Sequence, residues 1–164
     1  MIGICGADLD ALTAAAVAAP RRRRNLNLHD DLDDPVQRLC NALEPDTYIR
    51  PHRHREPGRW ELFAALRGAA SVLLLDPEGQ LRERLELAAE GPCPLVEIPA
   101  GAWHTVVAQR PGTVLLEVKP GPYRPLTAKD FAAWAPPEDD PLAPAFLARL
   151  RAAAVGDPLA GAGA

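Results

Sequence analysis

Three of the four histidines of this chain lie in two short segments whose residues favour β-strands. His52 and His54 are two residues apart, and alternate side chains of a strand point to the same face. Glu61 opens the apolar run that follows, and His104 comes soon after a turn sequence at residues 99–101. Three imidazoles and one carboxylate suit Zn, Fe, Mn, Ni or Cu and are poor ligands for Ca or Mg. The sequence therefore predicts that strands of a β-barrel bring these four side chains around one divalent transition-metal ion.

Solvated histidines are the alternative explanation of this pattern. A His-x-His pair in a polar loop often binds nothing, and this pair has arginines at positions 50, 53, 55 and 59 around it. The presence of both segments favours the metal, because Glu61 leads into an apolar run and His104 into an apolar strand. Glu56 is the alternative carboxylate ligand, since it is nearer to His54 in sequence, but it lies in a polar turn where a solvated side chain is expected.

Further polar residues could bind a substrate or move a proton next to the metal. Tyr48 and Arg50 share strand parity with His52, so regular pairing would point both side chains into the barrel. There Arg50 would bind an anionic ligand; alternatively it lies at the barrel mouth, facing water or paired with Glu117. His29 is either an additional base in the pocket or a structural histidine. The candidate catalytic residues are His29, Tyr48 and Glu117, and the candidate substrate contacts are Asn27, Arg50, Phe63, Lys119 and Tyr123.

The two histidine segments resemble the paired motifs of the cupin superfamily, whose members are small jelly-roll barrels. The first motif is matched by His52-Arg-His54, then by Glu61 and, after six intervening residues, by Gly68. The second motif is matched by Pro99-Ala-Gly101-Ala-Trp-His104. The resemblance implies that the four protein ligands of the metal are His52, His54, Glu61 and His104.

Departures from the cupin pattern lie mainly in turns. Six residues separate His54 from Glu61, where three or four are usual in the family, so a longer hairpin is expected. The leading glycines of the two motifs are replaced by Asp46 and Cys93, and the closing asparagine of the second motif by Ala108. These are turn or packing positions, so the expected metal ligands are unaffected.

A narrower resemblance covers most of the chain, from about residue 21 to residue 136. The stretches that carry it are residues 24–29, 36–43, 51–54, 60–63, 117–123 and 129–136. They resemble the WbuC-type cupin-fold metalloproteins, which are associated with bacterial polysaccharide gene clusters. This resemblance implies a sugar-related ligand and identifies the scaffold more closely than the reaction.

The remaining pattern predicts an all-β fold. A helix is expected over residues 10–19, and a second over residues 144–154. Short strands separated by turn residues are expected near 36–43, 47–54, 60–66, 70–76, 81–87, 94–98, 103–108 and 113–119. We expect a single jelly-roll (cupin) β-barrel at 36–125, a helix and arm at 1–35 that pack on it, and a partly helical C-terminal extension at 126–164 with a disordered tail from residue 156.

Charge and composition restrict the classes of partner. The net charge is −4, which argues against nucleic acid as a partner. The four arginines at 21–24 could bind a phosphate or carboxylate, or pair with the aspartates at 30–34.

There is no apolar run near the ~20 residues that span a bilayer, and no signal-peptide pattern. Three cysteines at unrelated spacings indicate reduced thiols, hence a cytoplasmic protein. A homodimer that covers barrel edge strands is expected.

Three classes of function agree with these features. The first is a metal-dependent isomerase or epimerase that acts on a sugar or nucleotide-sugar, with the metal as Lewis acid and a nearby base moving a proton. The second is an Fe(II)-dependent dioxygenase, because three histidines and one glutamate leave two octahedral positions open. The third is a non-catalytic module that binds a small anionic or sugar-like ligand through the metal and Arg50.

Overall fold

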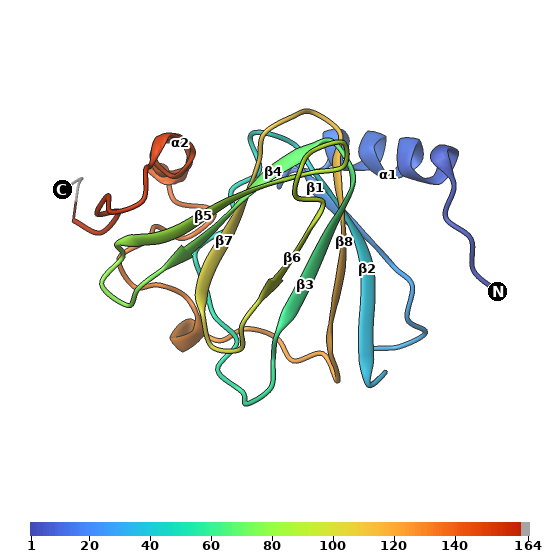
Figure 1. Ribbon diagram of the computed structural model, residues 1–164, viewed down its shortest axis with the longest axis horizontal. Helices are drawn as coiled ribbons and strands as arrows, with labels where there is room; N and C mark the ends of the chain where they lie inside the picture. The colour runs from blue at the N-terminus through green and yellow to red at the C-terminus, as the bar shows by residue number, and fades with distance from the viewer. Residues whose placement is uncertain (162–164) are drawn as a thin grey trace.

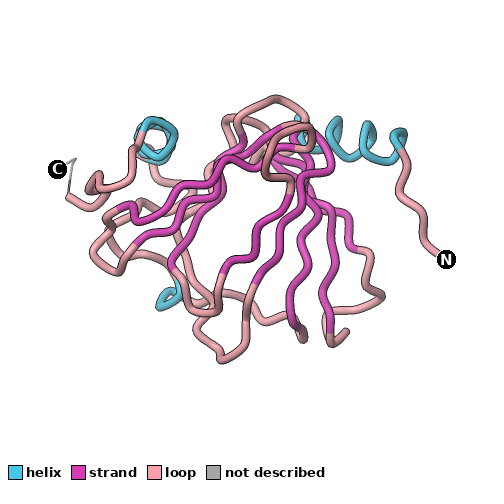
Figure 2. Tube along the Cα trace, in the orientation of Figure 1, coloured by secondary structure: helices cyan, strands magenta, loops and turns pink. Residues whose placement is uncertain are grey.

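The computed structural model describes residues 1–161, which fold into two antiparallel β-sheets with a helix on either side (Figure 1). Strands form the body of the molecule in the trace of Figure 2, and the helical segments lie around its edge. In order along the described chain, the elements are α1 (Gly6–Ala18), β1 (Arg23–Asn27), β2 (Val36–Leu43), β3 (Glu61–Arg67), β4 (Ala69–Leu75), β5 (Leu81–Ala88), β6 (Leu95–Ile98), β7 (Trp103–Ala108), β8 (Thr113–Pro120), the short 3₁₀ helix η1 (Ala128–Asp130) and α2 (Ala143–Ala152).

The larger sheet has the strand order β1-β2-β8-β3-β6. Alternate residues of its strands face opposite sides, as the pleat of a strand requires. One face packs on α1, where the buried side chains of Leu12 and Ala16 meet Cys40, Ala42 and Val114. The opposite face of this sheet is therefore the one turned towards the interior of the barrel.

The smaller sheet has the strand order β5-β4-β7 and closes the barrel. The shared core contains Phe63 and Leu115 from the larger sheet and Val72, Leu87 and Val106 from the smaller one. The outer face of the smaller sheet is also covered, because the C-terminal extension packs its own apolar side chains there. Burial on both faces explains why β4 reads as a nearly continuous apolar run rather than an alternating one.

The predicted fold class, an all-β jelly-roll barrel with a short N-terminal helix and a partly helical C-terminal extension, is confirmed by this arrangement. The strand expected at 47–54 does not form; that segment is irregular except at His52, which forms isolated bridges with His104 and with Phe131. An additional strand, β1, pairs with β2 through the contact of Asn27 with Leu39. Neither helix in the described part of the chain is long and apolar enough to span a membrane.

The end of the chain is more ordered than its composition indicated. Gly156 to Ala164 was expected to be disordered, yet Leu159 is only 2% exposed and donates its backbone N–H to the Gly79 carbonyl at 2.8 Å. Pro158 forms a bridge with Gln80. Apolar burial and these hydrogen bonds hold residues 156–161 on the smaller sheet; residues 162–164 of the expected tail lie outside the described part.

Candidate metal centre

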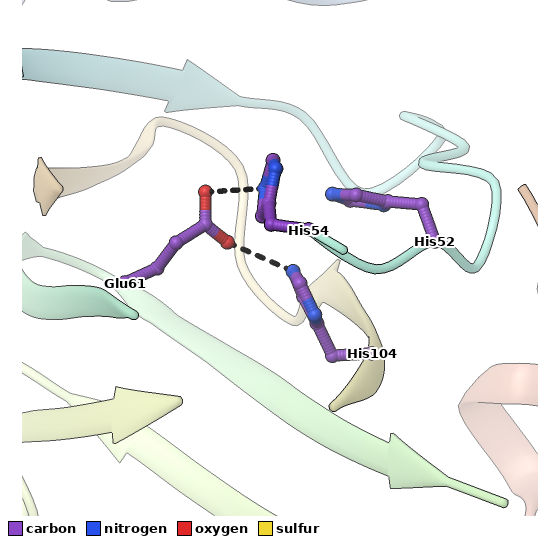
Figure 3. A group of neighbouring side chains, drawn as sticks. All are labelled: His52, His54, Glu61 and His104. Atoms are coloured by element: carbon purple, nitrogen blue, oxygen red, sulfur yellow. Dashed lines mark ion pairs between the residues drawn. The ribbon is translucent and has the colours of Figure 1, made fainter. Parts of the chain in front are cut away.

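The four predicted ligands meet at one place inside the barrel (Figure 3). His52 and His54 come from the loop before β3, Glu61 is the first residue of β3, and His104 is the second residue of β7. One ligand atom from each side chain can be chosen so that all lie within 4.8 Å of one another. Four donor atoms this close together are suitably placed for a single ion.

A segment from the C-terminal extension fixes the loop that carries His52. The Arg53 N–H donates to the Asp130 carbonyl at 2.9 Å, and the Ala132 N–H donates to the Pro51 carbonyl at 2.9 Å. Between these bonds, His52 forms an antiparallel bridge with Phe131. The loop is therefore held by strand-like pairing although it is not part of either sheet.

Backbone carbonyls set the tautomers of two of the histidines. The Nδ1 atom of His52 lies 3.0 Å from the Arg50 carbonyl oxygen, and Nδ1 of His104 lies 3.0 Å from the Ala102 carbonyl oxygen. A carbonyl oxygen only accepts hydrogen bonds, so each Nδ1 carries the proton in the neutral ring. Each Nε2 then presents a lone pair, as in histidines that bind metals.

The contacts around Glu61 also point to a cation. His54 Nε2 lies 2.9 Å from Oε1 of Glu61, and His104 Nε2 lies 2.9 Å from Oε2. Both Nε2 atoms are buried, and neither makes a hydrogen bond of good geometry within the described structure. For His104, a lone pair on Nε2 facing a carboxylate oxygen is a contact between two acceptors, which requires a proton or a metal ion nearby. The donor set and its geometry therefore fit a transition metal.

The electrostatic environment keeps His52 and Glu61 in the protonation states that metal binding requires. Burial, with a smaller contribution from the nearby His104, lowers the pKa of His52 to about 3. Burial alone would raise the pKa of Glu61, but His104, His54 and the Lys119 ammonium hold it well below its ordinary value. The structure thus favours a neutral imidazole and an ionised carboxylate.

A cavity of about 430 Å³ opens beside this cluster. Lys119 lies between two carboxylates there: its Nζ is 3.1 Å from Oε1 of Glu61 and also forms an ion pair with Glu117. The other carboxylate oxygen of Glu117 accepts a 2.5 Å hydrogen bond from the Asn41 amide. Burial raises the pKa of Glu117 in spite of Lys119. The pKa of Lys119 is raised as well, because the two carboxylates outweigh the effect of its burial.

One family model matches about half of this chain. The family described as "Domain of unknown function (DUF6016)" matches residues 4–87. The chain belongs to this family. A search of curated proteins gave no match.

Solved structures similar to this DUF6016 member include proteins named as cupins and as enzymes. KdgF from Halomonas sp. is 21% identical, with 65% of this chain and 84% of the other covered and a TM-score of 0.49. A Bacillus subtilis oxalate decarboxylase OxdC mutant is 18% identical, with coverages of 68% and 28% and a TM-score of 0.49. A cupin superfamily protein from Desulfitobacterium hafniense DCB-2 is 16% identical, with coverages of 66% and 86% and a TM-score of 0.49.

Most of the candidate pocket residues lie around the cavity of this DUF6016 member. Those that line it are Asn27, His29, Phe63, Glu117, Lys119 and Tyr123, together with the four candidate metal ligands. They come from β1, β3 and β8 of the larger sheet, from β7 of the smaller sheet and from neighbouring loops, so both sheets contribute to the lining of the cavity.

Tyr48 and Arg50 were expected to face the cavity, and this is wrong. The Tyr48 hydroxyl donates to the Pro136 carbonyl at 2.9 Å, and its ring packs against Phe146 in the C-terminal extension. Arg50 donates to the Ala132 carbonyl at 2.8 Å and lies over the Phe131 ring. The expectation depended on regular alternation through residues 47–54, and the irregular backbone there turns both side chains outward.

Sequence reasoning missed several residues that line the cavity. Asn25 and Asn41 lie on strands, and Asn41 could have been found because it shares parity with Leu39 and Leu43 in the predicted strand. Arg59 lies in the loop before β3, where its guanidinium donates to the Pro120 and Pro122 carbonyls. No local signal indicates that position, because these two carbonyl partners are distant in sequence.

The arginine run at residues 21–24 does not reach the cavity as a group. Arg21 and Arg23 pair with Glu138, and Arg22 pairs with Asp46 at 3.0 Å. Only Arg23 also borders the cavity. The pairing partners are thus in the C-terminal extension and in a turn, rather than among the aspartates at 30–34.

Proposed function

We propose that this protein is a metal-dependent cupin enzyme that acts on a sugar or nucleotide-sugar, as an isomerase or epimerase. The observation that carries the proposal is the convergence of His52, His54, Glu61 and His104 beside a cavity that also holds a buried acid–base pair. A metal site alone would fit a structural role. A cavity of this size next to the ligands supports a small-molecule reaction.

The metal, when bound by these four residues, would act as a Lewis acid on a carbonyl or hydroxyl oxygen. Glu117 is the candidate that moves the proton, because it lines the cavity and its pKa is raised towards the range of a useful acid or base. Lys119 is placed to donate a hydrogen bond to the substrate or to hold Glu117 in position. Tyr48 is not part of this proposal, since its hydroxyl is bound outside the cavity.

The proposed ligand class rests on the uncharged polar side chains of the larger sheet. Asn25, Asn27 and Asn41 line the cavity on the side of β1 and β2. Amide groups offer both donors and acceptors and so match the hydroxyl groups of sugars. The resemblance to WbuC-type proteins points in the same direction, and we propose a role in bacterial polysaccharide biosynthesis.

Metal analysis followed by a proton-exchange assay tests this function. The purified protein should contain close to one equivalent of Zn, Fe, Mn or Ni, removable by a chelator. NMR in D₂O then follows exchange of sugar C–H protons with solvent across a set of nucleotide-sugars. Glu117→Gln should abolish exchange while keeping the metal, and Glu97→Gln, on the exposed side of β6, should be silent.

Two other functions give different results in these assays. An Fe(II)-dependent dioxygenase would contain iron and consume O₂ with the substrate, which an oxygen electrode detects. A binding module would take up ligand without exchange or O₂ consumption. The three imidazoles and single carboxylate fit both of these alternatives as well as the isomerase.

We also propose a cytoplasmic homodimer in which residues 36–125 form the barrel unit. β6 lies at the edge of the larger sheet, and Leu95 on it is 50% exposed. Unpaired edges of this kind are commonly covered by a second chain. The three cysteines are free thiols, as expected in a reducing compartment. Light scattering coupled to gel filtration should give twice the 17.6 kDa chain mass.

A further inference from the structure

The cavity has a second polar region near β1, across the inner face of the larger sheet from the metal cluster beside β3. Gln37 on β2 pairs with Lys119 on β8, and Lys119 lies against Glu61 on β3. His29 follows β1, the strand on the far side of β2, and it also lines the cavity. Strands lie about 4.8 Å apart, so β1 and β3 are separated by roughly 14 Å. A ligand held at the metal can therefore extend across the sheet towards His29.

His29 presents an unpartnered polar atom to this space. The residue is only 8% exposed, and its Nε2 atom is buried without a hydrogen-bond partner in the described structure. Outside the four candidate metal ligands, it is the one cavity-lining residue whose buried side-chain nitrogen lacks a partner among the residues described. A buried polar group without a partner is costly, so such a group in a cavity is suited to meet a ligand atom.

The other ring nitrogen of His29 shows which atom carries the proton. Nδ1 lies 3.0 Å from the Arg38 backbone N–H, which points at it, and 2.9 Å from the Arg38 carbonyl oxygen. That carbonyl already accepts the Leu28 N–H at 2.7 Å, whereas the Arg38 N–H needs an acceptor. Nδ1 is therefore the acceptor, and in the neutral ring the proton is on Nε2.

We propose that His29 is a specificity-determining residue whose Nε2–H donates a hydrogen bond to a hydroxyl oxygen of a sugar, at the end of the cavity away from the metal. This inference rests on the proposed sugar function and replaces the acid–base role expected for His29 from the sequence. Its neighbours fit an uncharged acceptor, because Asn25 and Asn27 lie on β1, the strand that precedes His29, and are joined by a 2.7 Å hydrogen bond.

Two substitutions separate this role from a structural one. In His29→Asn, the amide oxygen takes the position of Nδ1 and keeps the bond from the Arg38 N–H, but nothing reaches the position of Nε2. In His29→Gln, the amide nitrogen reaches the position of Nε2 and keeps a donor there. If His29 binds the sugar, the glutamine variant should bind it and the asparagine variant should not. If His29 is purely structural, the glutamine variant should be the more strongly impaired of the two.

The experiment is an NMR titration of the zinc-loaded protein with D-glucose, N-acetyl-D-glucosamine and D-glucuronate. We expect at least one sugar to shift the His29 ring signals. His29→Asn should raise the Kd for that sugar about fivefold or more, which corresponds to the loss of one hydrogen bond. His29→Gln should stay within about twofold, and ¹⁵N spectra of the free protein should show the proton on Nε2.

Three outcomes overturn the proposal: a proton found on Nδ1, equal binding by wild type and His29→Asn, or no effect of any of the three sugars on His29. Zinc content is measured in every sample by elemental analysis. If zinc stays at one equivalent while sugar binding fails, the role of His29 is wrong but the metal site stands. If zinc itself does not bind, the metal site and with it the proposed function are refuted.

Discussion

His52 and His104 face each other across an isolated antiparallel bridge in which each backbone N–H donates to the carbonyl of the other residue, at 3.0 and 2.8 Å. Their ring centroids are 4.4 Å apart. The two histidines come from separate segments, yet their backbones are fixed to one another directly. This backbone pairing holds two of the candidate metal ligands in place, which reduces the conformational entropy that ion binding must overcome.

Removing either of these histidines should strongly reduce metal binding. We expect His52→Ala and His104→Ala to weaken it by more than the 10- to 100-fold typical of outer-sphere partners. The melting temperature should fall in parallel, because an ion at 100 times its Kd stabilises the native state by about 2.7 kcal/mol. Elemental analysis and calorimetry measure both effects. A double variant that retains a full equivalent of metal would refute the ligand assignment.

Glu61 and Glu56 provide a matched pair of carboxylates. Glu61 is buried against two histidines, whereas Glu56 is exposed and pairs with Arg59. Glu61→Gln should lower the metal affinity at least tenfold, since it removes the one charged ligand. Glu56→Gln should leave the affinity within about twofold, because surface ion pairs contribute little. Competition with a fluorescent chelator gives both values; comparable losses in the two variants would contradict the assignment of Glu61.

Lys119 and Glu117 should depend on each other for stability. Lys119→Met leaves the buried carboxylate of Glu117 without its main counter-charge, and we expect the free energy of unfolding to fall by about 3 kcal/mol. The double variant Lys119→Met/Glu117→Leu removes both charges and should recover most of this loss. Urea denaturation measures the free energy of unfolding of the metal-free wild type, the single variant and the double variant. Lys129→Met, at an exposed site, is the control, and additive losses in the double variant would show that the pair is not coupled.

Arg50→Ala should act on stability and not on ligand binding. The guanidinium holds the Ala132 carbonyl and lies 5.4 Å from the Phe131 ring centroid, outside the cavity. Loss of these contacts should cost about 1 kcal/mol. Thermal denaturation and the NMR sugar titration measure the two properties. A selective loss of sugar binding in this variant would show that Arg50 reaches the ligand after all.

The metal-free protein should lose stability as the pH falls. Burial lowers the pKa of His52 from its ordinary value of 6.5 to about 3, so between these values the unfolded chain binds a proton that the folded chain excludes. The stabilising contribution is complete above about pH 6.5 and is lost on acidification through this window. Urea denaturation at about pH 7.5 and about pH 5 tests this. In His52→Gln, the free energy of unfolding should differ less between the two pH values than in the wild type. An equal difference in the two proteins would show that other groups cause the effect.

The regular strands could be predicted because their signals are local. β2 and β7 have the bounds that the sequence indicated, since turn residues flank apolar runs at both places. The Pro-x-Gly-x-x-His spacing of the second motif also placed His104 correctly on a strand, because Gly101 adopts the positive φ of +79° that its turn requires.

The segment around His52 could not be predicted in the same way. Its backbone partners are His104 on one side and Phe131 on the other, both distant in sequence. Strand parity applies only along a continuous ladder, so it gave the wrong direction for Tyr48 and Arg50. The ring of His29 was equally hard to interpret, because its role depends on the Arg38 backbone, which only the fold brings beside it.

The pairing of residues 51–53 with residues 130–132 has a consequence for the order of folding. The histidine loop is synthesised early, but half of its hydrogen-bond partners come from a segment near the end of the chain. Closing that long loop carries an entropic cost that is offset only once the barrel has brought the two segments close. We therefore expect the histidine loop to become fixed only when residues 130–132 dock on it, so that tight ion binding during refolding would report this docking step.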